Sequence, residues 1–248
     1  RVILEKYVSM EQLGIYTLGY EIGMVMAVLV DSINKAWQPN YFELMSSNFY
    51  DKNKKEFENR RFFSLWFIAT GSICLIGMLW TKEILILLAP ERYNKATSIA
   101  PIIILSYFFH GIYFFAVSPI FFYKKTKLLP FFTGVAALLN IILNILFVPR
   151  FGIYGAAYAT LMSFVFQAAC VYFFGRLYFD PKFELKKISF ALSFLFIILA
   201  SNIYLKIGWK IEVFKFSYLL LFVFGTVYIF KDYTYFSIKK FFYKQNIH

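Results

Sequence analysis

The segment Asn140–Thr160, NIILNILFVPRFGIYGAAYAT, decides how this chain folds. Its first half is apolar except for Asn140 and Asn144, which lie four residues apart and so share one face of a helix. The letters PRFG at Pro149–Gly152 end that helix and reverse the chain, because proline and glycine are strong turn formers. The second half begins a new helix with small residues, including Gly155. The segment therefore predicts a transmembrane hairpin whose inner faces are polar or small.

The composition indicates a membrane protein. Hydrophobic residues make up 60% of the 248 residues, aromatic residues make up 23%, and the mean hydropathy is +0.62. Soluble domains are about 45–50% apolar, so only a bilayer can solvate this much apolar surface. Cys74 and Cys170 both lie in apolar stretches, where they predict small buried side chains and no disulfide, metal site or cofactor.

Seven stretches are long enough to cross the hydrocarbon core, which takes about 20 apolar residues per helix. A membrane β-barrel is excluded, because its strands would be about half as long and would alternate in polarity. The predicted fold class is therefore an all-α, polytopic transmembrane bundle of about seven helices. The predicted spans are Leu13–Ala36, Phe62–Trp80, Ser98–Phe122, Leu128–Val148, Ile153–Phe174, Ile188–Leu205 and Ile211–Phe230.

The net charge of +12 is compatible with nucleic-acid binding, but the basic residues lie between the spans, which favours the positive-inside rule. We therefore expect no nucleic-acid partner. One set of connections holds sixteen lysines and arginines: Lys52, Lys54, Lys55, Arg60, Arg61, Lys124, Lys125, Lys127, Arg176, Lys182, Lys186, Lys187, Lys231, Lys239, Lys240 and Lys244. The opposite set holds nine: Arg1, Lys6, Lys82, Arg92, Lys95, Arg150, Lys206, Lys210 and Lys215. The richer set is predicted to be cytoplasmic, which places the C-terminus inside and the turn at Pro149 outside.

The chain divides by composition into three parts. Residues 1–187 are predicted to form a bundle of five spans, residues 188–230 two additional transmembrane helices, and residues 231–248 a basic, aromatic cytoplasmic tail. The segment after Trp80, KEILILLAPERYNKA, either extends the second helix or lies in the membrane interface. The tail Tyr233–His248 is either an interfacial helix on an anionic leaflet or a frayed basic end.

Ionisable side chains inside a span are costly and are candidates for function. Glu21 has no partner at helical spacing, so it either serves cation coupling or makes an interhelical hydrogen bond. Asp31 and Lys35 lie at i and i+4 and are predicted to pair. His110 is near the middle of the third span, where it is either a proton switch or a hydrogen-bonding partner of a neighbouring helix.

Two stripes of polar or small residues flank the predicted turn. Asn140 and Asn144 form the first, and Gln167 ends the second, which runs at a spacing of four through Gly155, Ala159 and Ser163. Small residues allow helices to approach closely, and polar side chains bond across the interface. The stripes therefore either pack the helices together or line a hydrophilic lumen.

The motifs of soluble enzymes and ATPases are missing. The sequence has no phosphate-binding loop, no glycine-rich nucleotide fingerprint, no nucleophile elbow and no cluster of histidine and cysteine. We therefore expect no enzyme. Any energy for transport would come from an ion gradient, the membrane potential or the gradient of the substrate.

Several motifs together resemble those of the Wzx-type polysaccharide flippases. The run NIILNILFVPRFGIYGAAYAT resembles their pattern of two asparagines, a proline-bounded turn and a Gly-Ala-Ala helix start. The opening RVILEKYVSMEQLGIYTLGYEIG is similar to the segment that follows an Asp-Arg pair in that family, with its Leu-Gly-Ile-Tyr step at Leu13–Tyr16. Trp37-Gln38-Pro39, and Leu88-Ala89-Pro90 followed by Ala96, also fit. The resemblance covers about residues 1–174.

This family belongs to a superfamily that also contains the multidrug (MATE) exporters and the lipid II flippases. The resemblance implies two helical bundles around a central cavity, alternating access and often fourteen helices. The chain, which begins at Arg1, would then be the C-terminal part, with the first helix of its bundle missing and its last two spans outside the core.

The resemblance also implies a substrate and a location. The substrate is undecaprenyl-pyrophosphate-linked oligosaccharide, moved across the bacterial inner membrane, with H⁺ or Na⁺ and the glycan polymerase machinery as further partners. Basic groups at a cavity mouth would attract the pyrophosphate, and Lys124, Lys125 and Lys127 are candidates, although they also read as ordinary topology determinants. The alternatives are a cation-coupled drug antiporter, a lipid II flippase, a polytopic O-antigen polymerase or ligase, and a membrane scaffold.

Overall fold

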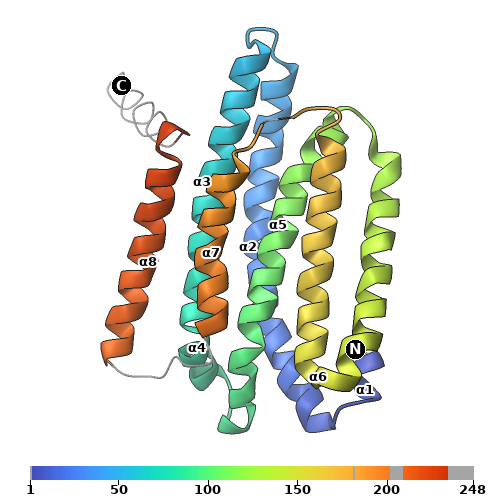
Figure 1. The fold of residues 1–248 in the computed structure, drawn as a ribbon, viewed down its shortest axis with the longest axis vertical. Coiled ribbons are helices and arrows are strands. Elements are labelled where there is room, and N and C mark those ends of the chain that lie inside the picture. The colour runs from blue at the N-terminus through green and yellow to red at the C-terminus, as the bar shows by residue number, and fades with distance from the viewer. Residues whose placement is uncertain (1, 181, 202–208, 234–248) are drawn as a thin grey trace.

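The computed structural model describes residues 2–180, 182–201 and 209–233, and within these ranges all regular structure is helical. The predicted all-α bundle is confirmed, and Figure 1 shows its long helices standing side by side. In chain order the helices are α1 (Val2–Glu5), α2 (Met10–Ser46), α3 (Lys52–Leu79), α4 (Thr81–Leu88), the 3-10 helix η1 (Glu91–Ser98), α5 (Ala100–Phe122), the 3-10 helix η2 (Thr126–Leu128), α6 (Leu129–Gly175), α7 (Leu185–Ser201) and α8 (Trp209–Ile229).

Five helical stretches in the described residues are long and apolar enough to cross a membrane. They are α2, α3, α5, the stretch Thr126–Gly175 that contains α6, and the part Ile211–Ile229 of α8. The 50-residue stretch contains two of the predicted spans, because α6 folds back on itself. The predicted span Ile188–Leu205 begins in α7, and its last four residues lie outside the described ranges.

The reversal in α6 is confirmed and is tighter than the sequence predicts. The helix continues through Pro149 to Phe151, and Gly152 alone leaves the helical region, with φ 55° and ψ −131°. Glycine tolerates this positive φ because it has no Cβ. Just after the turn, a Cβ built on Gly155 would lie 2.6 Å from the carbonyl carbon and oxygen of Phe147. The two limbs of α6 therefore approach backbone to backbone.

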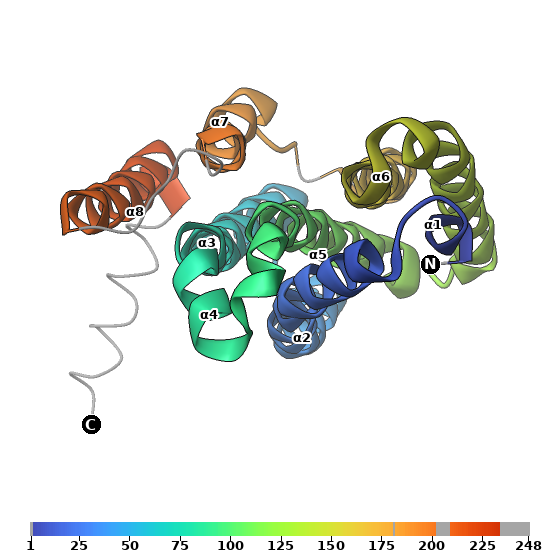
Figure 2. The same ribbon diagram turned by 90° about the horizontal axis from the view of Figure 1, so that it is seen from below.

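Helix α5 is the centre of the bundle. Its most apolar window is 72% buried, the highest share among the candidate spans. Figure 2 shows α5 between α2, α3 and α6; α7 packs on α3 and α5 on the side away from α2, and α8 lies beside α3. The close approach of α2 depends on small residues, since a Cβ on Gly23 would collide with Ile103 of α5.

Within the described residues, the connections of the two predicted sets lie at opposite ends of the bundle. The α2–α3, α5–α6 and α6–α7 connections gather at the upper end of Figure 1, and the N-terminus, α4 and the Gly152 turn gather at the lower end. The count of lysines and arginines in the connections misplaces one residue. Lys215 was assigned to a connection, but it lies in the second turn of α8 and is 1% exposed, because two carboxylates surround its ammonium group.

The segment after Trp80 forms a separate short helix, α4. The backbone of Trp80 leaves the helical region, with φ −102° and ψ 14°, so α4 is not a straight extension of α3. The other segment left open by the sequence is the tail Tyr233–His248. Apart from Tyr233, it lies outside the described residues.

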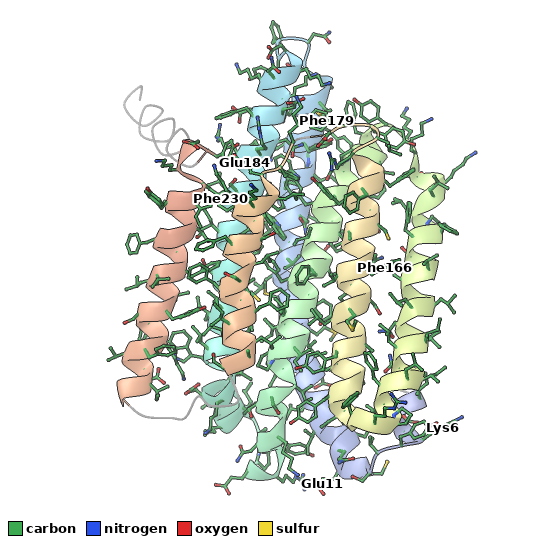
Figure 3. All side chains as sticks on the ribbon, in the orientation of Figure 1. Lys6, Glu11, Phe166, Phe179, Glu184 and Phe230 are labelled. Atoms are coloured by element: carbon green, nitrogen blue, oxygen red, sulfur yellow. The ribbon has the colours of Figure 1, made fainter. Side chains whose placement is uncertain are left out.

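A charged network attaches the upper end of α8 to α7. The Tyr233 hydroxyl donates a hydrogen bond of 2.7 Å to Glu184, and Lys187 lies 2.8 Å from Glu184 and 3.5 Å from Asp232. Figure 3 shows Glu184 and Phe230 near the same end of the bundle. Partial burial raises the pKa of the Glu184 carboxyl, but hydrogen bonds from Lys187 and Tyr233 outweigh this and leave that pKa below its ordinary value.

This network predicts acid sensitivity. A carboxyl whose pKa is lowered by folding stabilises the folded state above its ordinary pKa, and this stabilisation is lost as the pH falls through the folded-state pKa. At pH 7 we expect Glu184→Gln to lower the free energy of unfolding by about 0.5 kcal/mol, because the pair is partly exposed. The difference from the wild type should shrink in thermal unfolding as the pH falls below about 4.3, the ordinary pKa of glutamate, and vanish only below the folded-state pKa. Glu43→Gln, at an exposed carboxyl, is the control; a difference that persists at low pH would contradict the assignment.

Candidate functional site

A polar cavity lies between α1, α2 and the two limbs of α6. Its volume is about 210 Å³, and most of its lining residues carry hydroxyl or amide groups. The lining residues are Leu4, Tyr16, Tyr20, Asn140, Asn144, Ala156 and Thr160. We call this cavity the polar pocket. It is formed by segments more than 100 residues apart in the sequence.

Helical periodicity places these side chains together. Tyr16 and Tyr20 are four residues apart on α2, and Asn140 and Asn144 are four residues apart on the first limb of α6. Residues at this spacing lie one above the other on a helix face. On the second limb, the small Ala156 lies one turn before Thr160, which leaves space in front of the asparagines.

Hydrogen bonds orient the two asparagines. The Asn144 side-chain nitrogen donates to the Asn140 backbone oxygen at 2.8 Å and to the Asn140 side-chain oxygen at 3.1 Å. The Thr160 hydroxyl donates to the Ala156 backbone oxygen at 3.1 Å. Among the described residues, no group bonds the Asn140 amide nitrogen or the Asn144 amide oxygen. The pocket therefore keeps one strong donor and one strong acceptor for a ligand.

An aromatic row leads from the polar pocket to His110. The Tyr107 hydroxyl donates a hydrogen bond of 3.1 Å to the Tyr20 hydroxyl, and the rings of Tyr107 and His110 are 6.3 Å apart. The His110 ring is stacked between Tyr113, at 5.5 Å and 8°, and Phe164, at 4.8 Å and 27°. The Nδ1 atom of His110 is buried and has no hydrogen-bond partner among the described residues.

The other predicted candidates lie outside the polar pocket. Glu21 is exposed and does not line it. Asp31 and Lys35 form the expected ion pair at 2.6 Å on a largely exposed face of α2. Gln167 is buried and donates a hydrogen bond of 3.4 Å to the Thr133 hydroxyl, which joins the two limbs of α6.

The three lysines predicted at a cavity mouth are at the other end of α6 from the Gly152 turn. Lys124, Lys125 and Lys127 are all exposed. At a rise of about 1.5 Å per residue, Lys127 is roughly 20 Å from Asn140 along the helix. They therefore do not contact the polar pocket.

Sequence reasoning missed Tyr16, Tyr20 and Thr160. The two tyrosines carry a usable signal, because two phenols four residues apart on an apolar helix place two hydroxyls on one face. Thr160 is the last residue of the segment that decides the fold, and no pattern distinguishes it from a threonine that bonds only its own helix.

Sequence reasoning also missed a buried charge cluster between α8, α3 and α4. Lys215 lies 2.5 Å from Glu83 and 2.9 Å from Glu212, and the Trp80 indole nitrogen donates a hydrogen bond of 3.0 Å to Glu212. The i,i+3 spacing of Glu212 and Lys215 could have predicted half of it. Glu83 is 132 residues away from Lys215, so only tertiary structure brings it there.

The chemistry of the polar pocket is that of a neutral binding site. Its lining carries no carboxylate, imidazole, thiol or ammonium group. No group of three or more histidine, cysteine, aspartate or glutamate side chains that could bind a metal ion occurs in the described part of the chain. The pocket suits an uncharged ligand rich in hydroxyl groups, held by amide and hydroxyl hydrogen bonds and by tyrosine rings.

Comparisons of the chain with protein-family models, with curated proteins and with solved structures find no match.

Proposed function

We propose that the chain is part of a transporter that moves a lipid-linked oligosaccharide across the bacterial inner membrane by alternating access. The observation that supports this proposal is the polar pocket within a bundle of membrane-length helices. Oligosaccharides expose hydroxyl groups on faces that are partly apolar. Amides, hydroxyls and aromatic rings are the groups that bind such a surface.

The neutral lining also favours this function over a cation-coupled drug antiporter. A cationic drug is held most strongly where a carboxylate faces its charge. None of the residues that line the pocket is acidic, and Glu21 lies outside it. The lipid and its pyrophosphate would remain in the bilayer and at its surface, where exposed basic residues such as Lys124 attract anions.

The proposal predicts that the two asparagines limit glycan transport. We expect Asn140→Leu and Asn144→Leu each to lower the transport rate by about tenfold. Each substitution removes one hydrogen bond to a polar group of the substrate, and its free energy of about 1.4 kcal/mol corresponds to a factor of ten in rate. The measurement is the rate at which lipid-linked glycan reaches the outer face in a deletion strain complemented with the full-length gene. Asn40→Leu is the matched control, since Asn40 also bonds the backbone four residues earlier but is exposed on α2 outside the polar pocket.

The deletion strain tests the function itself. Lipid-linked glycan should accumulate on the cytoplasmic side when the gene is removed. Normal surface glycan in this strain, with no redundant flippase present, would overturn the proposed function.

A further inference from the structure

The half-buried His110 side chain has an arrangement that its packing does not explain. It lies in the middle of α5, the most buried helix, yet its Nδ1 atom has no hydrogen-bond partner among the described residues. An unpaired buried polar atom costs free energy in the neutral imidazole. The adjacent rings are positioned for a cation, since an imidazolium between the faces of Tyr113 and Phe164 is stabilised by both ring quadrupoles.

The imidazole is also connected to the polar pocket. Tyr20 lines the pocket, its hydroxyl is hydrogen-bonded to that of Tyr107, and the Tyr107 ring packs edge-on against His110. Phenol hydroxyls both donate and accept hydrogen bonds, so this pair places two groups that can relay a proton between the polar pocket and the ring that packs against His110.

The charged and titratable groups around His110 are few. Its own helix supplies Tyr107 and Tyr113, and α2 supplies Tyr20 and Asp31. The Asp31 carboxylate is a charged group that acts on His110 electrostatically, and Asp31 is itself paired with Lys35. From α6 the ring that faces His110 is Phe164, which does not titrate.

We infer that His110 is a proton-binding site that exchanges protons with the polar pocket along the Tyr107–Tyr20 pair. A hydronium ion in the pocket gives up a proton that forms an N–H bond at Nδ1, which leaves a neutral water in the pocket and an imidazolium on α5. The same proton returns by the reverse route. This inference rests on the proposed function only in one respect, namely that the proton is then coupled to glycan movement.

Proton binding can be tested without the substrate. The ¹⁵N imidazole signal of His110 in ¹⁵N-histidine NMR of the protein in nanodiscs is identified by its absence from the spectrum of the His110→Gln variant. We expect that signal to change from the neutral to the protonated form as the pH is lowered from about 6.5, the ordinary pKa of histidine, to about 4. A signal that stays neutral throughout this range would overturn the inference.

The route can be tested in the same sample. Tyr20→Phe and Tyr107→Phe should each slow proton exchange at His110 by about tenfold, because each removes a hydroxyl from the route. Tyr113→Phe is the matched control, since it removes a hydroxyl beside His110 but keeps the stacked ring. Equal slowing in all three variants would overturn the route.

Coupling to transport has a separate readout. His110→Gln should flatten the pH profile of glycan movement in the complemented deletion strain, and Tyr158→Phe, at an exposed tyrosine of α6 outside the polar pocket, should leave the profile unchanged. A profile that keeps its shape in His110→Gln would overturn the coupling. If His110 titrates but the asparagine variants transport normally, the proposed function fails and the proton site stands; the reverse result would leave the function and remove the proton site.

Discussion

Replacing Lys215 by methionine is expected to lower the free energy of unfolding by about 3 kcal/mol, the lower end of the cost of breaking a buried ion pair. The side chain is 1% exposed and lies between Glu83 and Glu212, which are 28% and 34% exposed. Without the ammonium group, two neighbouring carboxylates remain with no cation between α8 and α4. The partial exposure of both carboxylates keeps the cost at the lower end of the range. The measurement is unfolding of the purified protein in detergent.

A charge-neutral variant separates the ion pair from simple packing. In Glu83→Gln/Glu212→Gln/Lys215→Met no carboxylate is left unpaired, so most of the lost stability should return. Lys127→Met, at an exposed lysine, should change the stability by less than about 0.5 kcal/mol. If the charge-neutral variant is as unstable as Lys215→Met, the loss comes from packing and the ion pair is not responsible.

Gly155→Ala should destabilise the hairpin by about 1–3 kcal/mol, the usual cost of inserting a methyl group where there is no space. The added carbon would lie 2.6 Å from the backbone of Phe147, and backbone atoms cannot move aside as a flexible side chain can. The limbs must separate, which would also widen the polar pocket. Unfolding in detergent measures the stability.

Gly134→Ala is the matched control for this substitution. It lies on the first limb of the same helix, and a Cβ there would meet no atom within 4 Å. Alanine in an open helical position should raise the stability by up to about 1 kcal/mol. Equal effects of the two substitutions would show that the limbs do not touch at Gly155.

The sequence predicts most of the fold because hydropathy and helix length are local properties. The hairpin at Asn140–Thr160 is found in this way, since a proline and a glycine interrupt two apolar stretches. The turn was placed across four residues, whereas the structure needs only Gly152. Pro149 lies inside the helix, where a proline is tolerated if the loss of its backbone hydrogen bond is tolerated. The sequence alone does not show whether that loss is tolerated.

The site was only half predictable. Asn140 and Asn144 were found because polar residues stand out in an apolar helix. Their partners Tyr16 and Tyr20 were not found, because tyrosine is common in this chain and its role depends on which helices meet. Lys215 was misplaced for the same reason, since its two carboxylate neighbours become visible only when α4 and α8 are placed together.

The unequal lengths of the helices have a mechanical consequence. Helix α2 has 37 residues, and at about 1.5 Å per residue it is roughly 55 Å long, against about 30 Å for a hydrocarbon core. Together with α3 it forms a hairpin whose tip, residues 46–52, projects beyond the other helices at the upper end of Figure 1. If α2 tilted as a rigid body about its contact with α5, the tip would therefore move further than the residues at the level of the polar pocket.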